Sequence, residues 1–124
     1  MPEPVLVVED DPDIREVMMA IVESEGHCAV AAENGDQALE LLRNGLHPCL
    51  ILLDLMMPVK DGWEFRAEQK VDPALASIPT IIVSAAGRQA IEALHPTATL
   101  EKPIDYDQLT RLLKRHCMTN HLFT

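Results

Sequence analysis

The sequence predicts an α/β fold, a doubly wound five-stranded parallel sheet with helices on both faces. Five short apolar runs alternate with segments that carry helical periodicity or helix caps. Residues 49–53 are five consecutive apolar residues, the pattern of a strand buried on both faces, as in parallel sheets. The chain has 124 residues, 48% of them apolar, and no change in composition marks a second domain.

The first two strands and the helix between them follow from residues 5–32. Residues 5–8 are a β-branched apolar run that predicts the first strand. Asp11 offers a helix start, because proline follows it and apolar side chains then recur three and four residues apart. Gly26 ends this helix, and residues 28–32 predict a second, weaker strand.

The second predicted helix has a start signal at one end and a stop signal at the other. Asn34 with Gln37 three residues later resembles a capping box, and Asn44 followed by glycine is a stop signal. The apolar run 49–53 then predicts the third strand, which delivers the carboxylate of Asp54 at its end.

The middle of the chain carries weaker helix signals. After a turn at Asp61, alternation predicts a helix, although residues 63–70 show no long apolar face. Residues 78–83 predict the fourth strand, which ends at Ser84. Residues 87–94, between this strand and the next apolar run, can form only a brief fourth helix.

The last strand and helix complete the alternation. Residues 98–100 predict a short fifth strand. Asp105 with Gln108 repeats the capping box, and basic residues gather in the last turn, where the helix dipole favours cations. We expect the residues after His116 to be frayed. Short connections between alternating strands and helices favour the doubly wound class.

Charge and hydropathy exclude several classes of partner. The net charge of −10 disfavours nucleic acid and anionic lipid, because both bind basic patches. No apolar run approaches the roughly 20 residues that a membrane span needs, and the amino terminus does not resemble a signal peptide. We therefore expect a cytoplasmic protein with no membrane partner and no direct nucleic-acid partner.

The cysteines and histidines predict no metal site. The three cysteines are odd in number and widely spaced, so we expect buried thiols rather than a disulfide. They are Cys28, Cys49 and Cys117. The five histidines lack metal-ligand spacing, and we expect them to be solvated. They are His27, His47, His95, His116 and His121.

Polar side chains follow four of the five predicted strands. Glu9 and Asp10 follow the first, Asp54 the third, Ser84 the fourth and Lys102 the fifth. The carboxyl ends of parallel strands meet at one edge, where α/β sheets bind ligands. Like charges held close together cost free energy unless a cation intervenes, and oxygen donors suit a hard divalent ion. The acids therefore predict a site for Mg²⁺.

Four ordered motifs carry a resemblance to a known family. VLVVEDD at residues 5–11, LDLMMPVKDG at 53–62, IIVSA at 81–85 and EKP at 101–103 resemble the receiver domain of two-component response regulators. The resemblance implies a flavodoxin-like (βα)5 fold. It also implies a single receiver domain across residues 1–124, with a core at about 4–116.

The resemblance implies a phosphoacceptor and a metal site. Asp54 would accept a phosphoryl group from a histidine kinase or phosphotransfer protein, and the domain would catalyse only its own phosphotransfer and dephosphorylation. Three acidic side chains and one backbone carbonyl would hold Mg²⁺. They belong to Glu9, Asp10, Asp54 and Met56.

The resemblance also implies a switch. Ser84 and Lys102 would contact the transferred group, and the peptide before Pro103 would be cis. Phosphorylation would then change binding of a downstream protein or output domain, with a phosphorylation-dependent dimer as another outcome. The chain departs from the family at Thr99, where an aromatic residue is usual, and in its short stretch over 87–94.

Other classes fit less well. A flavodoxin-like cofactor binder needs a hydroxyl- and glycine-rich loop after the first strand, where this chain has acids. A phosphatase with an aspartate nucleophile would carry a second aspartate where this chain has Met56. The remaining alternative is a phosphorylation-independent receiver-like interaction module, which Thr99 and the short helical stretch favour.

Overall fold

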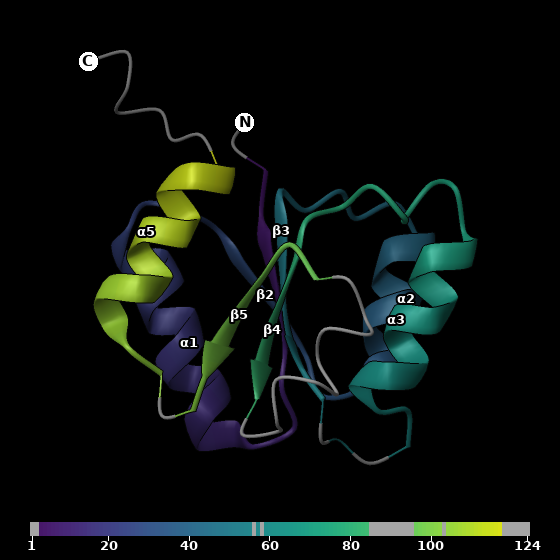
Figure 1. The fold of residues 1–124 in the computed structure, drawn as a ribbon, viewed down its shortest axis with the longest axis horizontal. Coiled ribbons are helices and arrows are strands. Elements are labelled where there is room, and N and C mark those ends of the chain that lie inside the picture. The colour runs from purple at the N-terminus through teal and green to yellow at the C-terminus, as the bar shows by residue number, and fades with distance from the viewer. Residues whose placement is uncertain (1–2, 56, 58, 85–95, 103, 118–124) are drawn as a thin grey trace.

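The computed structural model describes residues 3–55, 57, 59–84, 96–102 and 104–117. Its five strands form one parallel sheet in the order β2-β1-β3-β4-β5, which confirms the predicted class (Figure 1). The elements are β1 (Val5–Val8), α1 (Pro12–Ser24), β2 (Ala29–Ala32), α2 (Gly35–Arg43), β3 (Leu50–Asp54), α3 (Gly62–Val71), β4 (Thr80–Ser84), β5 (Ala98–Glu101) and α5 (Tyr106–His116). The brief helix expected over 87–94 lies outside the described residues.

Helices cover both faces of the sheet. Figure 1 shows α2 and α3 on one face and α1 and α5 on the other. Alternate residues of the central strands enter the two cores, so Ile51 and Leu53 pack on the α2 side while Leu50 and Leu52 pack on the α1 side. All four are fully buried, as the apolar run predicted. No helix in the described part of the chain is long and apolar enough to cross a lipid bilayer.

Local caps begin the helices where the sequence placed them. The Asp11 side chain accepts hydrogen bonds from the backbone N–H groups of residues 13 and 14, and Asp105 caps α5 in the same way. Asn34 accepts from the backbone N–H of Gln37 at 2.9 Å. The Gln37 side chain accepts from the N–H of Glu33, one residue before the cap, so this capping box is only half formed.

Helix α3 has a partly polar inner face, which explains its weak sequence pattern. A full capping box between Asp61 and Glu64 begins the helix. Gln69 is fully buried and donates hydrogen bonds to Thr80 Oγ1 at 3.0 Å and to the Leu75 carbonyl at 3.1 Å. The Arg66 side chain donates to Gln69 Oε1 at 2.8 Å. Buried polar side chains that bond to one another interrupt the apolar stripe without exposing that face.

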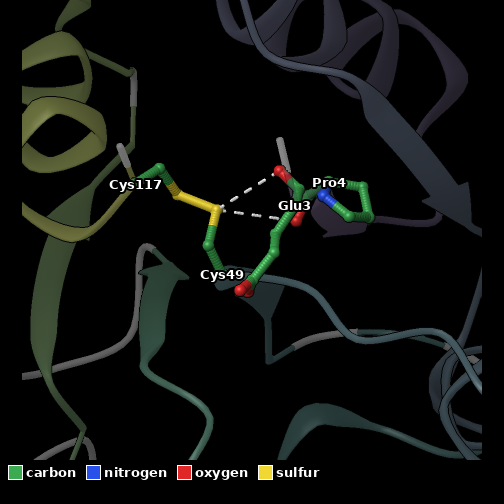
Figure 2. Close-up of a disulfide and its surroundings, with 4 residues drawn as sticks. All are labelled: Glu3, Pro4, Cys49 and Cys117. Atoms are coloured by element: carbon green, nitrogen blue, oxygen red, sulfur yellow. Dashed lines mark hydrogen bonds between the residues drawn. A yellow bond between two sulfur atoms is a disulfide. The ribbon is translucent and has the colours of Figure 1, made fainter. Parts of the chain in front are cut away.

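The cysteine prediction was wrong. Cys49 and Cys117 form a disulfide, with their Cα atoms 5.5 Å apart (Figure 2). The amino end of β3 and the carboxyl end of α5 meet at one edge of the sheet, a closeness that a sequence separation of 68 does not reveal. The remaining thiol, Cys28, is exposed rather than buried.

The solvated role predicted for the histidines was wrong for His27. Gly26 adopts a φ of +86° after α1, a conformation that glycine enters at little cost. The backbone N–H of His27 then donates to the Val22 carbonyl at 3.3 Å. This turn holds His27 against the protein interior, where the residue is only 4% exposed.

Candidate functional site

Four strands end at one edge of the sheet and carry the predicted site residues together. Glu9 follows β1, Asp54 ends β3, Ser84 ends β4 and Lys102 follows β5. The strands are parallel and nearly in step, with Asp54 opposite Val83 in the neighbouring strand. This register places the four residues at the same carboxyl edge of the sheet, where the sequence analysis expected the carboxyl ends of the strands to meet.

The three acids form a compact cluster. One carboxylate oxygen from each of Glu9, Asp10 and Asp54 lies within 4.8 Å of the other two. Glu9 is fully buried and Asp54 is 3% exposed, whereas Asp10 is partly exposed and opens the cluster to solvent. Three hard oxygen donors that converge and reach solvent on one side fit a small divalent cation such as Mg²⁺.

Lys102 supplies the positive charge of the cluster. Its Nζ lies 2.7 Å from Glu9 Oε1 and 3.5 Å from Asp54 Oδ1. Burial by itself would lower the pKa of Lys102, but the interactions with Glu9 and Asp54 outweigh burial and raise that pKa. The lysine is therefore a permanent cation at neutral pH.

One lysine does not compensate for three carboxylates. Burial raises the pKa of Glu9, and a hydrogen bond with Asp54 raises it further, while Lys102 acts in the opposite direction. Burial and the neighbouring Glu9 likewise raise the pKa of Asp10. Both shifts indicate that the cluster favours protons or cations, because its ionised form concentrates negative charge in a partly desolvated space.

Ser84 borders this cluster from the neighbouring strand. The residue is fully buried, and its carbonyl accepts a hydrogen bond from the Lys102 N–H at 3.3 Å. Ser84 pairs with Glu101 across the β4–β5 ladder, so the strand register fixes Ser84 relative to Lys102. The serine hydroxyl is thus carried on the same edge as the acids.

Thr99, a further predicted switch residue, lies apart from the acid cluster. Thr99 lies within β5 opposite Ile82, and its side chain is exposed. It lines a hollow of about 260 Å³ between β5 and α5, together with residues that include Arg111 and Arg115. Met56 and Pro103 lie outside the described residues.

Arg15 contributes to the site although the sequence did not predict it. This residue lies in α1, and its guanidinium donates from Nη1 to the carbonyls of Glu9 at 3.0 Å and Asp10 at 3.3 Å. Arg15 therefore holds the main chain of the two acids. The only signal in the sequence is its position one helical turn after the start of α1, which by itself indicates no role.

Gly62 has a packing role that the turn predicted at Asp61 does not reveal. A Cβ atom on Gly62 would lie 2.6 Å from both the Asp54 carbonyl oxygen and the Leu55 Cα. Its N–H donates to the Leu55 carbonyl at 2.9 Å. Only glycine lets the first turn of α3 approach the backbone of Asp54 this closely.

A flavodoxin-like fold with acids and a lysine at the carboxyl edge of its sheet is the arrangement of a signal-receiver domain. The response regulator receiver domain family matches residues 5–114. The chain belongs to this family.

Individual proteins agree with that assignment. An uncharacterized 14.6 kDa protein of Leptolyngbya boryana is 35% identical over 92% of this chain and 89% of its own length. Response regulator Rre1 of Synechocystis is 33% identical over 92% of this chain, which spans 52% of that longer protein. A putative response regulator from Chloroflexus aurantiacus has the same fold, with a TM-score of 0.85, 22% identity and coverage of 93% of this chain and 97% of its own.

Proposed function

We propose that the chain accepts a phosphoryl group on Asp54 from a histidine kinase or phosphotransfer protein, with Mg²⁺, and so changes the binding of a partner. The position of Asp54 among its charged neighbours supports this proposal. Asp54 Oδ1 lies 3.5 Å from Lys102 Nζ, and one carboxylate oxygen of Asp54 lies within 4.8 Å of one oxygen each of Glu9 and Asp10. A candidate nucleophile, a cation and a candidate metal-ligand set thus share one edge of the sheet, which supports the proposal.

Mg²⁺ would be held by the side chains of Glu9, Asp10 and Asp54 and by the Met56 carbonyl. When bound, the ion would neutralise negative charge as one anion approaches another. The partly exposed Asp10 would contact the ion from the solvent side, and the buried Glu9 would contact it from the protein interior.

The side chains of this chain account for the transfer itself. A carboxylate oxygen of Asp54 forms a bond to phosphorus while the bond from phosphorus to the donor histidine nitrogen breaks, and that nitrogen keeps the electron pair. Lys102 offers a fixed positive charge to the oxygens of the transferring group. Ser84 lies on the adjoining strand, where its hydroxyl would donate to the aspartyl phosphate and draw its loop inward.

The same proposal covers the wider role of the chain. We regard residues 4–116 as one receiver unit that works in the cytoplasm and is not a turnover enzyme. Its output would be a downstream protein or output domain, or a phosphorylation-dependent dimer. Thr99 and Pro103 would relay the change at Ser84. The exposed threonine favours one alternative, a receiver-like module that binds partners without phosphorylation.

Phosphorylation with a small-molecule donor tests the proposal. The chain is incubated with acetyl phosphate and MgCl₂, and intact mass reports the number of phosphoryl groups. We expect one acid-labile group on the unaltered chain and none on Asp54→Asn. Asp13→Asn is the control, because it removes an exposed acid of α1 and should label normally. A folded, unaltered chain that gains no phosphoryl group would favour the phosphorylation-independent alternative.

A further inference from the structure

We propose that Arg15 is a positioning residue for the metal site, which it shapes by holding the main chain of Glu9 and Asp10. This inference rests on the proposed function, because it assigns a role to Arg15 in the Mg²⁺ binding that phosphotransfer needs. Arg15 would act through the backbone of two proposed ligand residues, whose carbonyls its guanidinium contacts.

One guanidinium nitrogen holds two successive carbonyls. Arg15 Nη1 lies 3.0 Å from the Glu9 oxygen and 3.3 Å from the Asp10 oxygen. The side chain is only 18% exposed, so these bonds are partly shielded from competing water. Helical side chains point toward the amino end of their helix, which directs Arg15 from α1 back to the segment before it.

The hydrogen bonds of Arg15 add to others that fix the main chain on either side of Glu9 and Asp10. The Glu9 N–H donates to the Ala32 carbonyl of β2 at 3.1 Å, which fixes the amino side of the segment. On the carboxyl side, the Arg15 N–H donates to the Asp11 carbonyl at 2.9 Å, and Asp11 caps α1. Arg15 therefore restrains the two peptide groups between these anchors, and these groups set the directions of the Glu9 and Asp10 side chains.

If Arg15 positions the metal ligands, its removal should change Mg²⁺ affinity in the opposite direction from the one expected if only its charge matters. A cation near a metal site repels Mg²⁺, so removing the charge of Arg15 should strengthen Mg²⁺ binding if charge alone matters. If Arg15 orients the ligands, its removal should weaken binding. Loss of a group that orients metal ligands typically costs about 10- to 100-fold in metal affinity.

The experiment is a calorimetric titration of MgCl₂ into the unaltered chain, Arg15→Met, Arg15→Lys and Arg43→Met. We expect the Kd for Mg²⁺ to rise about tenfold or more in Arg15→Met. Lysine keeps the charge but lacks the planar fork, so Arg15→Lys should restore only part of the affinity. Arg43→Met removes the same charge from an exposed pair with Glu68 on α2 and α3, and should not weaken binding.

A second measurement separates positioning from general loss of structure. The rate of phosphorylation by acetyl phosphate is measured as MgCl₂ is raised. We expect Arg15→Met to reach the rate of the unaltered chain at saturating Mg²⁺, because the ion itself draws the ligands into place. Amide exchange of residues 9–11 without metal should be faster in Arg15→Lys than in the unaltered chain.

Two outcomes overturn the inference, and they differ from failure of the proposed function. An unchanged or lower Kd in Arg15→Met would show that Arg15 acts at most as a nearby charge. A rate deficit that persists at saturating Mg²⁺ would show that it does not act through the metal site. If the unaltered chain itself binds no Mg²⁺, the metal site of the proposed function fails and the role of Arg15 falls with it.

Discussion

Val59 has a strained backbone in the loop that follows Asp54. Among the described non-glycine residues it alone has a positive φ, +69°, and it is 75% exposed. A β-branched residue in this left-handed region crowds the next carbonyl, at a cost of about 1–2 kcal/mol. Backbone strain of this kind gathers in loops at functional sites. The loop joins the proposed phosphoacceptor to α3.

Replacing Val59 with asparagine should relieve this strain. Asparagine enters the left-handed region more readily, so we expect Val59→Asn to raise the free energy of unfolding by about 0.5–1 kcal/mol. Urea denaturation measures the change. Val71→Asn is the control, since Val71 is 81% exposed at the end of α3 and is not among the residues with positive φ. Equal effects in the two variants would contradict a strained backbone at Val59.

Among the helices and strands, those whose start depends on residues close in sequence were predicted well. Features that depend on contacts between distant residues were not. Caps at Asp11 and Asp105 are formed by residues two or three positions apart, so the sequence alone locates these helix starts. Helix α3 was predicted only by alternation, because Gln69 points inward and bonds to Thr80 of β4. A buried polar side chain looks solvated until its distant partner is known.

The disulfide joins two elements that the sequence keeps apart. Cys49 precedes β3 and Cys117 caps α5, so the bond ties the carboxyl end of that helix to the sheet (Figure 2). The disulfide lies at the amino end of β3 and Asp54 lies at its carboxyl end, so the two are at opposite ends of the same strand. In a reducing cytoplasm the pair would exist as two thiols. The free energy of unfolding should therefore be measured for the disulfide form and for the form with two thiols.

Breaking this bond should lower stability. We expect Cys49→Ser to lose about 2–4 kcal/mol of unfolding free energy in non-reducing buffer, because a cross-link over a long loop restricts the unfolded chain. Adding a reductant should cause the same loss in the unaltered chain and no further loss in the variant. Cys28→Ser, which removes the exposed thiol, should have no effect. If the unaltered chain does not respond to reductant, the bond is not formed in solution.

At the scale of the whole molecule, parallel topology explains why the candidate site could be predicted. Once the strands alternate with helices, every carboxyl end falls on one edge, so Glu9, Asp54 and Lys102 are brought together by the fold class alone. Arg15 could not be predicted in this way. It acts on main-chain carbonyls, which carry no side-chain identity in the sequence.

The charge of the whole molecule makes the acid cluster costly without a metal. The net charge is −10, and Glu9, Asp10 and Asp54 concentrate part of it in one place. Ion binding to the folded chain adds stability according to RT ln(1 + [Mg²⁺]/Kd), about 2.7 kcal/mol at 100 times the Kd. The unaltered chain should therefore gain stability from MgCl₂ beyond what KCl gives at equal ionic strength.

Asp10→Asn tests whether this gain belongs to the acid cluster. Without Mg²⁺ we expect the variant to be more stable by about 0.5–1 kcal/mol, because it loses like-charge repulsion that solvent partly screens. With MgCl₂ the order should reverse, since the variant lacks a ligand and gains little. Thermal and urea unfolding in MgCl₂ and in KCl of matched ionic strength measure both effects. An equal Mg²⁺ gain in the two chains would mean that the ion stabilises the molecule by screening its overall charge, and that Asp10 does not bind it.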